Sequence, residues 1–182
     1  MKEQYIDSPD HFLYKRFQEL YKVSFPLFEQ RSEQQQMQAF RNDKYRLLAF
    51  TENEAFVGFI SYWEFDTYLY VEHLAIDTEM RGKGYGSRML DRFIRSQAKI
   101  VLLEIDPVVD EVSMARSRFY TRCGFFHNPY KHKHPPYRKE FPPHPLIVLT
   151  TERPITETEY RMFNDHLVRI VMNRTPEHPA RL

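Results

Sequence analysis

Hydrophobic residues recur with two different periods along this chain, and the two periods predict helices and strands. Near the N-terminus, Ser8-Pro9-Asp10 is a typical helix start and apolar positions then recur every three to four residues, so a helix is predicted over 9–23. Ser32 followed by Gln35 resembles a capping box, which predicts a second, polar helix as far as about Phe40.

A hairpin and a further strand follow the two helices. Aromatic, β-branched and other apolar residues fill 45–50 and 55–65, and the polar turn 52–54 between them indicates an antiparallel hairpin. A third strand is predicted over 68–76, and a short edge strand is expected ahead of the first helix, around 4–6.

The middle of the chain alternates strands with helices. The strand at 68–76 leads through a glycine cluster into a helix that extends to about residue 98, and the nearly all-apolar run 100–105 is typical of a buried parallel strand. Asp110 can cap the next helix, which ends near Gly124, a residue suited to the left-handed C-terminal position. Because antiparallel strands precede this unit and more strands follow it, a mixed sheet is predicted, in an α/β (α+β) fold.

Two features mark the C-terminal part. Six of the twelve prolines lie within 129–145, which predicts an irregular loop ahead of a strand over 146–150. Thr156 and Glu159 form a capping-box pattern, so a last helix is predicted over about 156–172.

Length and composition describe one folded domain. The 182 residues contain 42% hydrophobic and 28% charged side chains, which is typical of a globular protein, and we expect a single domain over 1–182. Twenty-six basic against 25 acidic residues leave a formal charge of +1, which argues against nucleic acid or a membrane as partner. A single cysteine, no membrane-length apolar run and no secretory signal indicate a cytoplasmic protein.

Glycine is rare in this chain and concentrated in one place. Three of the five glycines lie at 82, 84 and 86, between the predicted strand and helix, where converging backbone N–H groups and a helix N-terminus suit a phosphate or pyrophosphate. Arg81 and Lys83 add positive charge there, and a tight turn with solvated basic side chains is the alternative. A dinucleotide-binding fold would need a glycine where Ser87 stands and a loop after its first strand, although Asp106 does end the next strand.

Two motifs give the chain a resemblance to a known family. The run Glu72-His73-Leu74-Ala75-Ile76 precedes Arg81-x-x-Gly84-x-Gly86, and about forty residues later comes Phe119-Tyr120-Thr121-Arg122-Cys123-Gly124-Phe125. Together with the order of elements from about residue 45 to 150, these motifs resemble the GNAT superfamily of acetyl-CoA-dependent N-acetyltransferases. An Asn that the family often carries seven residues before the tyrosine is Ser113 here, and the last helix is not part of the core family pattern.

The resemblance implies a splayed central sheet with helices on both faces and acetyl-CoA as co-substrate. A strand edge freed by the splay could pair with the two pantetheine amides through backbone groups, and the glycine loop would hold the pyrophosphate. The residues that the resemblance implies for binding acetyl-CoA are Leu74, Ala75, Ile76, Arg81, Gly82, Lys83, Gly84, Tyr85, Gly86 and Ser87.

Attack of an amine on a thioester needs a proton acceptor and a proton donor. An alkyl ammonium of pKa near 10.4 is seldom neutral at pH 7, a deficit of about 4.6 kcal/mol. Strand alternation places Glu72 on the same face as Leu74 and Ile76, so Glu72 is the candidate catalytic base, with pairing to a nearby Lys or Arg as the alternative. His73 is expected on the other face, as a core or supporting histidine. Tyr120 matches the family's general-acid tyrosine, and packing beside its aromatic neighbour is the alternative.

The resulting hypothesis is an N-acetyltransferase that moves an acetyl group from acetyl-CoA to a primary amine on a small molecule or peptide by direct attack. The alternative is a catalytically inactive acyl-CoA-binding sensor or partner-binding module. The histidines within 127–144 lack carboxylate or thiol partners at ligand spacing, so no metal is predicted. The basic proline-rich segment containing Pro135-Pro136-Tyr137 suits a substrate lid that favours an acidic group, and Cys123 is assigned no role.

Overall fold

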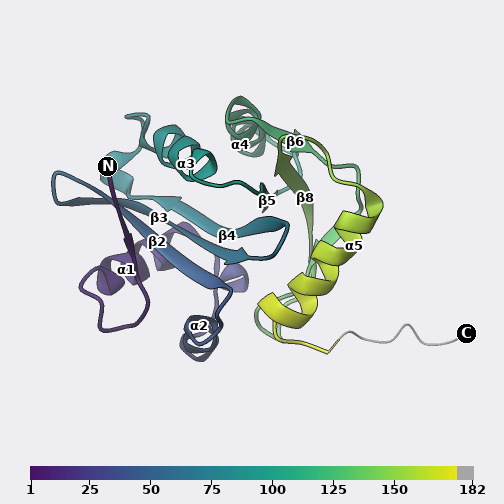
Figure 1. Ribbon diagram of the computed structural model, residues 1–182, viewed down its shortest axis with the longest axis horizontal. Helices are drawn as coiled ribbons and strands as arrows, with labels where there is room; N and C mark the ends of the chain where they lie inside the picture. Colours follow the sequence, from purple (N-terminus) through teal and green to yellow (C-terminus); the bar gives the residue numbers. More distant parts are fainter. Residues whose placement is uncertain (176–182) are drawn as a thin grey trace, which may run out of the picture.

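The computed structural model describes residues 1–175, and its strands form an open, mixed sheet in the order β1-β2-β3-β4-β5-β8-β6, with β7 paired to β8 (Figure 1). The strands are β1 (Lys2–Tyr5), β2 (Tyr45–Glu52), β3 (Ala55–Glu64), β4 (Tyr68–Ile76), β5 (Ile100–Ile105), β6 (Phe125–His127), β7 (His132–His134) and β8 (His144–Thr151). The helices are α1 (Tyr14–Ser24), α2 (Glu33–Phe40), α3 (Tyr85–Arg95), α4 (Glu111–Arg122) and α5 (Glu157–His166), with short 3-10 turns η1 (Leu27–Glu29) and η2 (Thr78–Met80) and a π-helical turn η3 (Leu167–Val171).

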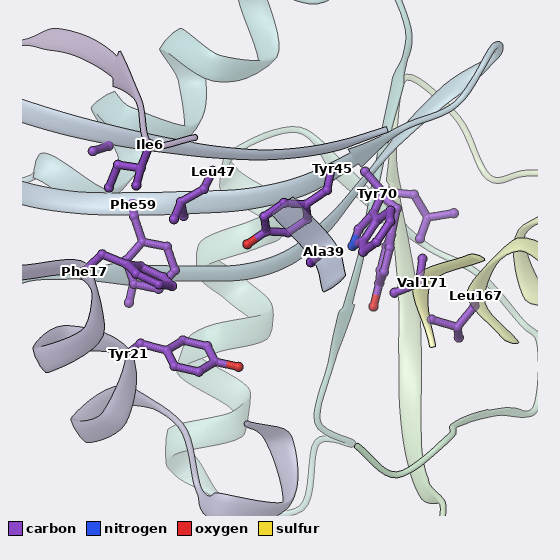
Figure 2. Packing of buried hydrophobic residues seen from close by; sticks show 14 of the residues in the cluster. Ile6, Phe17, Tyr21, Ala39, Tyr45, Leu47, Phe59, Tyr70, Leu167 and Val171 are labelled. Carbon is purple, nitrogen blue, oxygen red and sulfur yellow. The ribbon is translucent and has the colours of Figure 1, made fainter. Parts of the chain in front are cut away.

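Each face of the sheet has its own apolar core. Helices α1 and α2 cover one face, and α3 covers the other, where Met89, Leu90 and Phe93 are buried (Figure 1). On the first face, Figure 2 shows Phe17 of α1 beside Phe59 of the sheet, and these two rings pack edge to face with their centroids 4.8 Å apart. The predicted mixed sheet with helices on both faces is therefore confirmed.

Local sequence signals account for most of the elements. Capping boxes begin α2 at Ser32, α4 at Asp110 and α5 at Thr156, and in each the N-cap side chain accepts a hydrogen bond from a backbone N–H three residues later. The predicted hairpin is β2–β3, and its turn holds Asn53 and Glu54 at positive φ. The last predicted helix corresponds to α5 continued by η3.

Two predictions about local structure are wrong. Helix α1 begins at Tyr14 and not at residue 9, because the carbonyl of Ser8 accepts from the His11 N–H and that of His11 from the Tyr14 N–H, which forms two successive turns ahead of the helix. The proline-rich segment is not entirely irregular, since β7 pairs with the start of β8. The dinucleotide-binding alternative is also excluded, because the strands that precede the glycine loop are antiparallel.

A β-bulge in β4 changes which side chains face which way. The β3–β4 register pairs Ser61 with His73 and Tyr62 with Val71, so Glu72 has no partner residue on β3. Because of this extra residue, Glu72 and His73 both point toward the face covered by α1 and α2, where their side chains meet Trp63 and Tyr21, whereas Leu74 packs on the α3 face. The predicted alternation, with Glu72 beside Leu74 and Ile76, is therefore wrong.

No helix among residues 1–175 is both long enough and apolar enough to cross a membrane.

Candidate active site

The sheet splits open between β4 and β5. Their parallel pairing covers only Tyr68–Val71 and Ile100–Leu103, and beyond it the two strands diverge, as the two halves of the sheet show in Figure 1. A cleft of about 880 Å³ lies at this divergence. It is lined by the end of β4, the glycine loop, the aromatic end of α4, and side chains from η1, β7 and β8.

The end of β4 presents backbone groups to this cleft. Leu74, Ala75 and Ile76 pair with β3 on one edge, and the pairing with β5 on the other edge stops at Val71. All three residues line the cleft. Their outward backbone groups are therefore placed to hydrogen-bond an extended ligand that carries amides, as another strand would.

The glycine loop follows directly on this strand. Gly82 and Gly84 adopt φ of 72° and 74°, and Gly84 is the N-cap of α3 without any side-chain cap, so the N–H groups of the first helical turn are left for an acceptor. The Arg81 guanidinium donates from Nε to the Ile76 carbonyl over 3.1 Å, which ties the loop to the end of β4.

The other loop residues differ in how they meet the cleft. Gly86, Tyr85 and Ser87 line it, and the Ser87 hydroxyl donates to the Gly84 carbonyl over 3.1 Å. Lys83 is exposed and is not among the cleft-lining residues. The structure thus brings together nine of the ten residues predicted to contact the co-substrate.

Tyr120 lies in the wall of the cleft on α4. Its ring packs edge to face against Phe119 and Phe125, with centroid distances of 5.1 and 5.7 Å. Burial raises the pKa of its hydroxyl to about 12, so the group holds its proton at neutral pH. Ser113, where the family often has Asn, is buried and completes the capping box of α4: its backbone N–H donates to the Asp110 carboxylate, and its hydroxyl accepts from the Asp110 N–H.

Glu72 is held in a buried network of donors. Its carboxylate accepts from Arg31 Nε (2.8 Å), Trp63 Nε1 (2.8 Å) and the Tyr137 hydroxyl (2.9 Å), and Arg31 Nη2 is 2.6 Å away. The side chain of Glu72 is fully buried, and that of Arg31 is 6% exposed. Although burial alone would raise it, the Arg31 guanidinium holds the pKa of Glu72 below its usual range.

His73 is also hydrogen-bonded within the protein. Its Nε2–H donates to the Glu29 carbonyl over 2.9 Å, and burial lowers its pKa to about 4, so the ring is neutral. This environment agrees with a supporting histidine.

On the β7–β8 side of the cleft, the sequence suggested only a lid around Tyr137, which lines the cleft, and did not predict the titratable side chains found there. Glu29 of η1, Glu104 of β5, His134 of β7 and His144 of β8 all line it. Burial and the nearby Asp106 raise the pKa of Glu29 to about 7. Only Glu104 carried a signal that could have been read, because it is the one charged residue in the apolar run 100–105.

Within residues 1–175, no three His, Cys, Asp or Glu side chains are grouped so as to hold a metal ion.

An open mixed sheet that splays beside a glycine loop defines a class of acyltransferase. The sequence matches the acetyltransferase (GNAT) family over residues 13–125, and the chain belongs to this family of acyltransferase enzymes.

Comparison with individual proteins agrees with this assignment. A protein described as a GNAT-family acetyltransferase from Bacteroides thetaiotaomicron superposes with a TM-score of 0.90 at 28% identity, covering 96% of this chain and 100% of its own. An aminoglycoside 6'-N-acetyltransferase solved with coenzyme A superposes at 0.58 with 16% identity, covering 85% of this chain and 100% of its own, which shows the shared fold. YjbC of Bacillus subtilis (strain 168), named as an acetyltransferase, is 35% identical over 66 residues, or 35% of this chain, and the match spans about a third (34%) of that protein.

Proposed function

We propose that this protein is an N-acetyltransferase that transfers the acetyl group of acetyl-CoA to a primary amine by direct attack. The observation that carries the proposal is the unpaired edge of β4 at Leu74–Ile76, which ends at the glycine loop and shares one cleft with Tyr120. This edge can pair with the pantetheine amides, and the N-terminus of α3 can accept the pyrophosphate. A relative with the same fold was solved with coenzyme A, which supports the same type of ligand here.

In this proposal Tyr120 protonates the departing thiolate. The Tyr120 hydroxyl keeps its proton at neutral pH and donates it as negative charge develops on the departing sulfur. The thiol that forms has a pKa of about 8.5, so the proton transfer belongs to the transition state, which is the role of a general acid. Its place in the cleft wall supports this role.

Glu72, the base predicted from the sequence, has an environment that favours a structural role. Its oxygens already accept from Arg31, Trp63 and Tyr137, and a carboxylate with a lowered pKa is a weak proton acceptor. We therefore propose that Glu72 anchors Arg31 and Tyr137 and that the amine proton goes to another group.

The test is an acetyl-transfer assay with a panel of primary amines, read by release of the CoA thiol. Thiol release that depends on an amine supports the proposal. Binding of acetyl-CoA by calorimetry without turnover on any amine would instead identify a catalytically inactive acyl-CoA-binding module. Failure to bind acetyl-CoA would overturn both.

A further inference from the structure

His134 carries a buried nitrogen without a hydrogen-bond partner in the part of the cleft that the proposed function leaves unassigned. The residue is 2% exposed, and its Nε2 has no partner among residues 1–175. The ring is fixed in place, because it stacks on Tyr137 with a centroid distance of 5.1 Å and lies on β7, which pairs with β8. His134 lines the cleft, and a buried polar atom without a partner costs free energy unless a ligand or water completes it.

The tautomer of His134 follows from its other nitrogen. Nδ1 lies 2.6 Å from the carbonyl oxygen of Pro135, which can only accept, so Nδ1 carries the hydrogen. In the neutral ring, Nε2 is therefore a free lone pair. Such a nitrogen can take up a proton without breaking any hydrogen bond that the ring makes.

The Glu104 carboxylate lies close enough to stabilise the positive charge of a protonated His134 ring. Glu104 Oε2 lies 3.8 Å from His134 Nε2, too far for a hydrogen bond but close enough to stabilise an imidazolium. The carboxylate is itself held, because it accepts from the Tyr70 hydroxyl over 2.5 Å and from His132 Nε2–H, and the other nitrogen of His132 meets the Tyr160 hydroxyl at 3.0 Å. Although burial opposes it, His134, His132 and Tyr70 lower the pKa of Glu104 to about 2, so it is ionised at neutral pH.

The position of this pair matches the reacting end of the co-substrate. Glu104 is the first residue of β5 beyond its pairing with β4, which ends at Val71 and Leu103. A pantetheine arm that starts at the glycine loop and pairs along Ile76 back to Glu72 covers about 16 Å of strand, at about 3.3 Å per residue. Its thioester then reaches the vertex of the splay, where Glu104 and His134 line the cleft.

Resting on the proposed acetyltransferase function, we infer that His134 Nε2 is the general base that deprotonates the acceptor ammonium, with Glu104 as the residue that positions and stabilises it. The acceptor amine enters between η1 and the β7–β8 pair, where the ionised Glu104 favours a cationic substrate over the acidic one expected from the sequence, while Asp106 is paired with Arg116. This cleft therefore selects alkyl amines that arrive as ammonium ions.

In the proposed acetyl transfer, each bond that breaks is matched by one that forms. The ammonium gives one proton to Nε2, and the freed lone pair of nitrogen forms the C–N bond as the C–S bond breaks. The sulfur takes the proton of Tyr120, and the second proton lost by the nitrogen returns to Tyr120. One amide and one thiol form, and His134 releases one proton to solvent.

The experiment compares His134→Asn with the parent protein in the thiol-release assay. The asparagine amide can still donate to the Pro135 carbonyl from the place of Nδ1, while Nε2 is deleted, so packing is largely kept. With an alkyl amine at pH 7 we expect the turnover rate to fall by about 100-fold or more, the range of general base catalysis. About 300-fold more of an amine of pKa 10.4 is neutral at pH 9.5 than at pH 7, so the variant should regain most of the parent's rate there.

Three further measurements isolate this role from a structural one. Acetyl-CoA affinity by calorimetry should be unchanged, and an acceptor amine that is already neutral at pH 7 should react with the variant at nearly the parent rate. His127→Asn, the same substitution at an exposed histidine of β6, should leave the pH profile unchanged. If His134→Asn does not fold, His134→Gln, which places an amide near Nε2, should show the same pH-dependent loss.

The pH profile also reports on the groups that surround His134. These are Glu29 on η1, Glu72 and His73 on β4, Glu104 on β5, Asp106 directly after β5, Arg116 on α4, and His132, Tyr137 and His144. A variant rate equal to the parent's, or a loss that is the same at pH 7 and 9.5, would overturn the assignment of His134 as base and leave the acetyltransferase proposal standing. If the parent itself releases no thiol with any amine, the proposed function fails and the base assignment falls with it.

Discussion

The buried pair between Arg31 and Glu72 offers the most discriminating test of how this site is built. In Glu72→Gln the side chain keeps its shape and loses its charge. One oxygen can no longer accept, because either the amide NH2 faces the Trp63 N–H or, flipped, it faces the Arg31 guanidinium and the Tyr137 hydroxyl. Arg31 stays in place through its bond to the Val171 carbonyl (2.8 Å) and between the rings of Trp63 and Tyr137. Its charge is then buried without a counter-ion.

The expected cost follows from that uncompensated charge. Breaking a buried ion pair by removing one partner costs about 3–5 kcal/mol. For a chain of this size each kcal/mol lowers the melting temperature by about 2–4 °C, so Glu72→Gln should melt about 6–20 °C below the parent. The exposed pair between Glu157 and Arg161 on α5 supplies the control, and Glu157→Gln should change the free energy of unfolding by less than about 0.5 kcal/mol.

The stability that Glu72 contributes to the folded protein depends on pH. Because the pKa of Glu72 is lowered in the folded protein, its contribution to stability is present above the unfolded carboxyl pKa and is lost as the pH falls through the lower folded value. The gap in melting temperature between parent and variant should therefore stay constant from pH 6 to 9 and close only in strong acid.

The assays are thermal melting across pH and the thiol-release rate at pH 7 and 9.5. A structural Glu72 predicts lower stability together with a rate ratio that does not change with pH. A variant that melts with the parent but loses its rate at pH 7 and regains it at pH 9.5 would refute this reasoning and return the role of base to Glu72.

The remaining predictions concern the co-substrate site and the strand beside it. Gly84→Val forces a β-branched residue into φ of 74° at the N-terminus of α3, so acetyl-CoA binding measured by calorimetry should be lost while the fold, followed by circular dichroism, persists; unchanged affinity would remove the phosphate-loop assignment. Tyr120→Phe removes only the hydroxyl, so the melting temperature should hold while turnover falls by about 100-fold or more, and turnover at the parent rate would reassign Tyr120 to packing. Gly58→Ala would place a Cβ in steric overlap with the Ala75 carbonyl oxygen, so β4 must shift, and both stability and acetyl-CoA affinity should drop; a variant as stable as the parent would show that the β3–β4 pair can relax.

Much of this fold could be predicted from sequence because its signals are local. A capping box needs residues three apart, so Ser32 with Gln35 and Thr156 with Glu159 identify the starts of α2 and α5 directly. The glycine loop could be recognised for the same reason. Glycine tolerates positive φ because it has no Cβ, and Gly82 and Gly84 adopt such angles.

The candidate site was only partly predictable because its decisive contacts join distant parts of the chain. Side chains along a strand alternate between the two faces of the sheet unless a bulge inserts an unpaired residue. The bulge at Glu72 depends on the register with β3, and this register cannot be read from residues 68–76 alone. Arg31 lies 41 residues from Glu72, and His132 lies 28 residues from Glu104, so neither pair can be identified before the chain is folded.

The sequence by itself therefore determined most of the elements, the family and the glycine loop, all of which depend on residue types at short spacing. The tertiary structure decided the protonation chemistry. Burial and charge partners set whether a carboxylate or an imidazole can take a proton, and both are properties of the packed molecule. For that reason Glu72, which the sequence indicated as a base, is enclosed by donors, whereas His134, within a proline-rich segment that the sequence indicated as a loop, lines the cleft and has a buried nitrogen without a partner among residues 1–175.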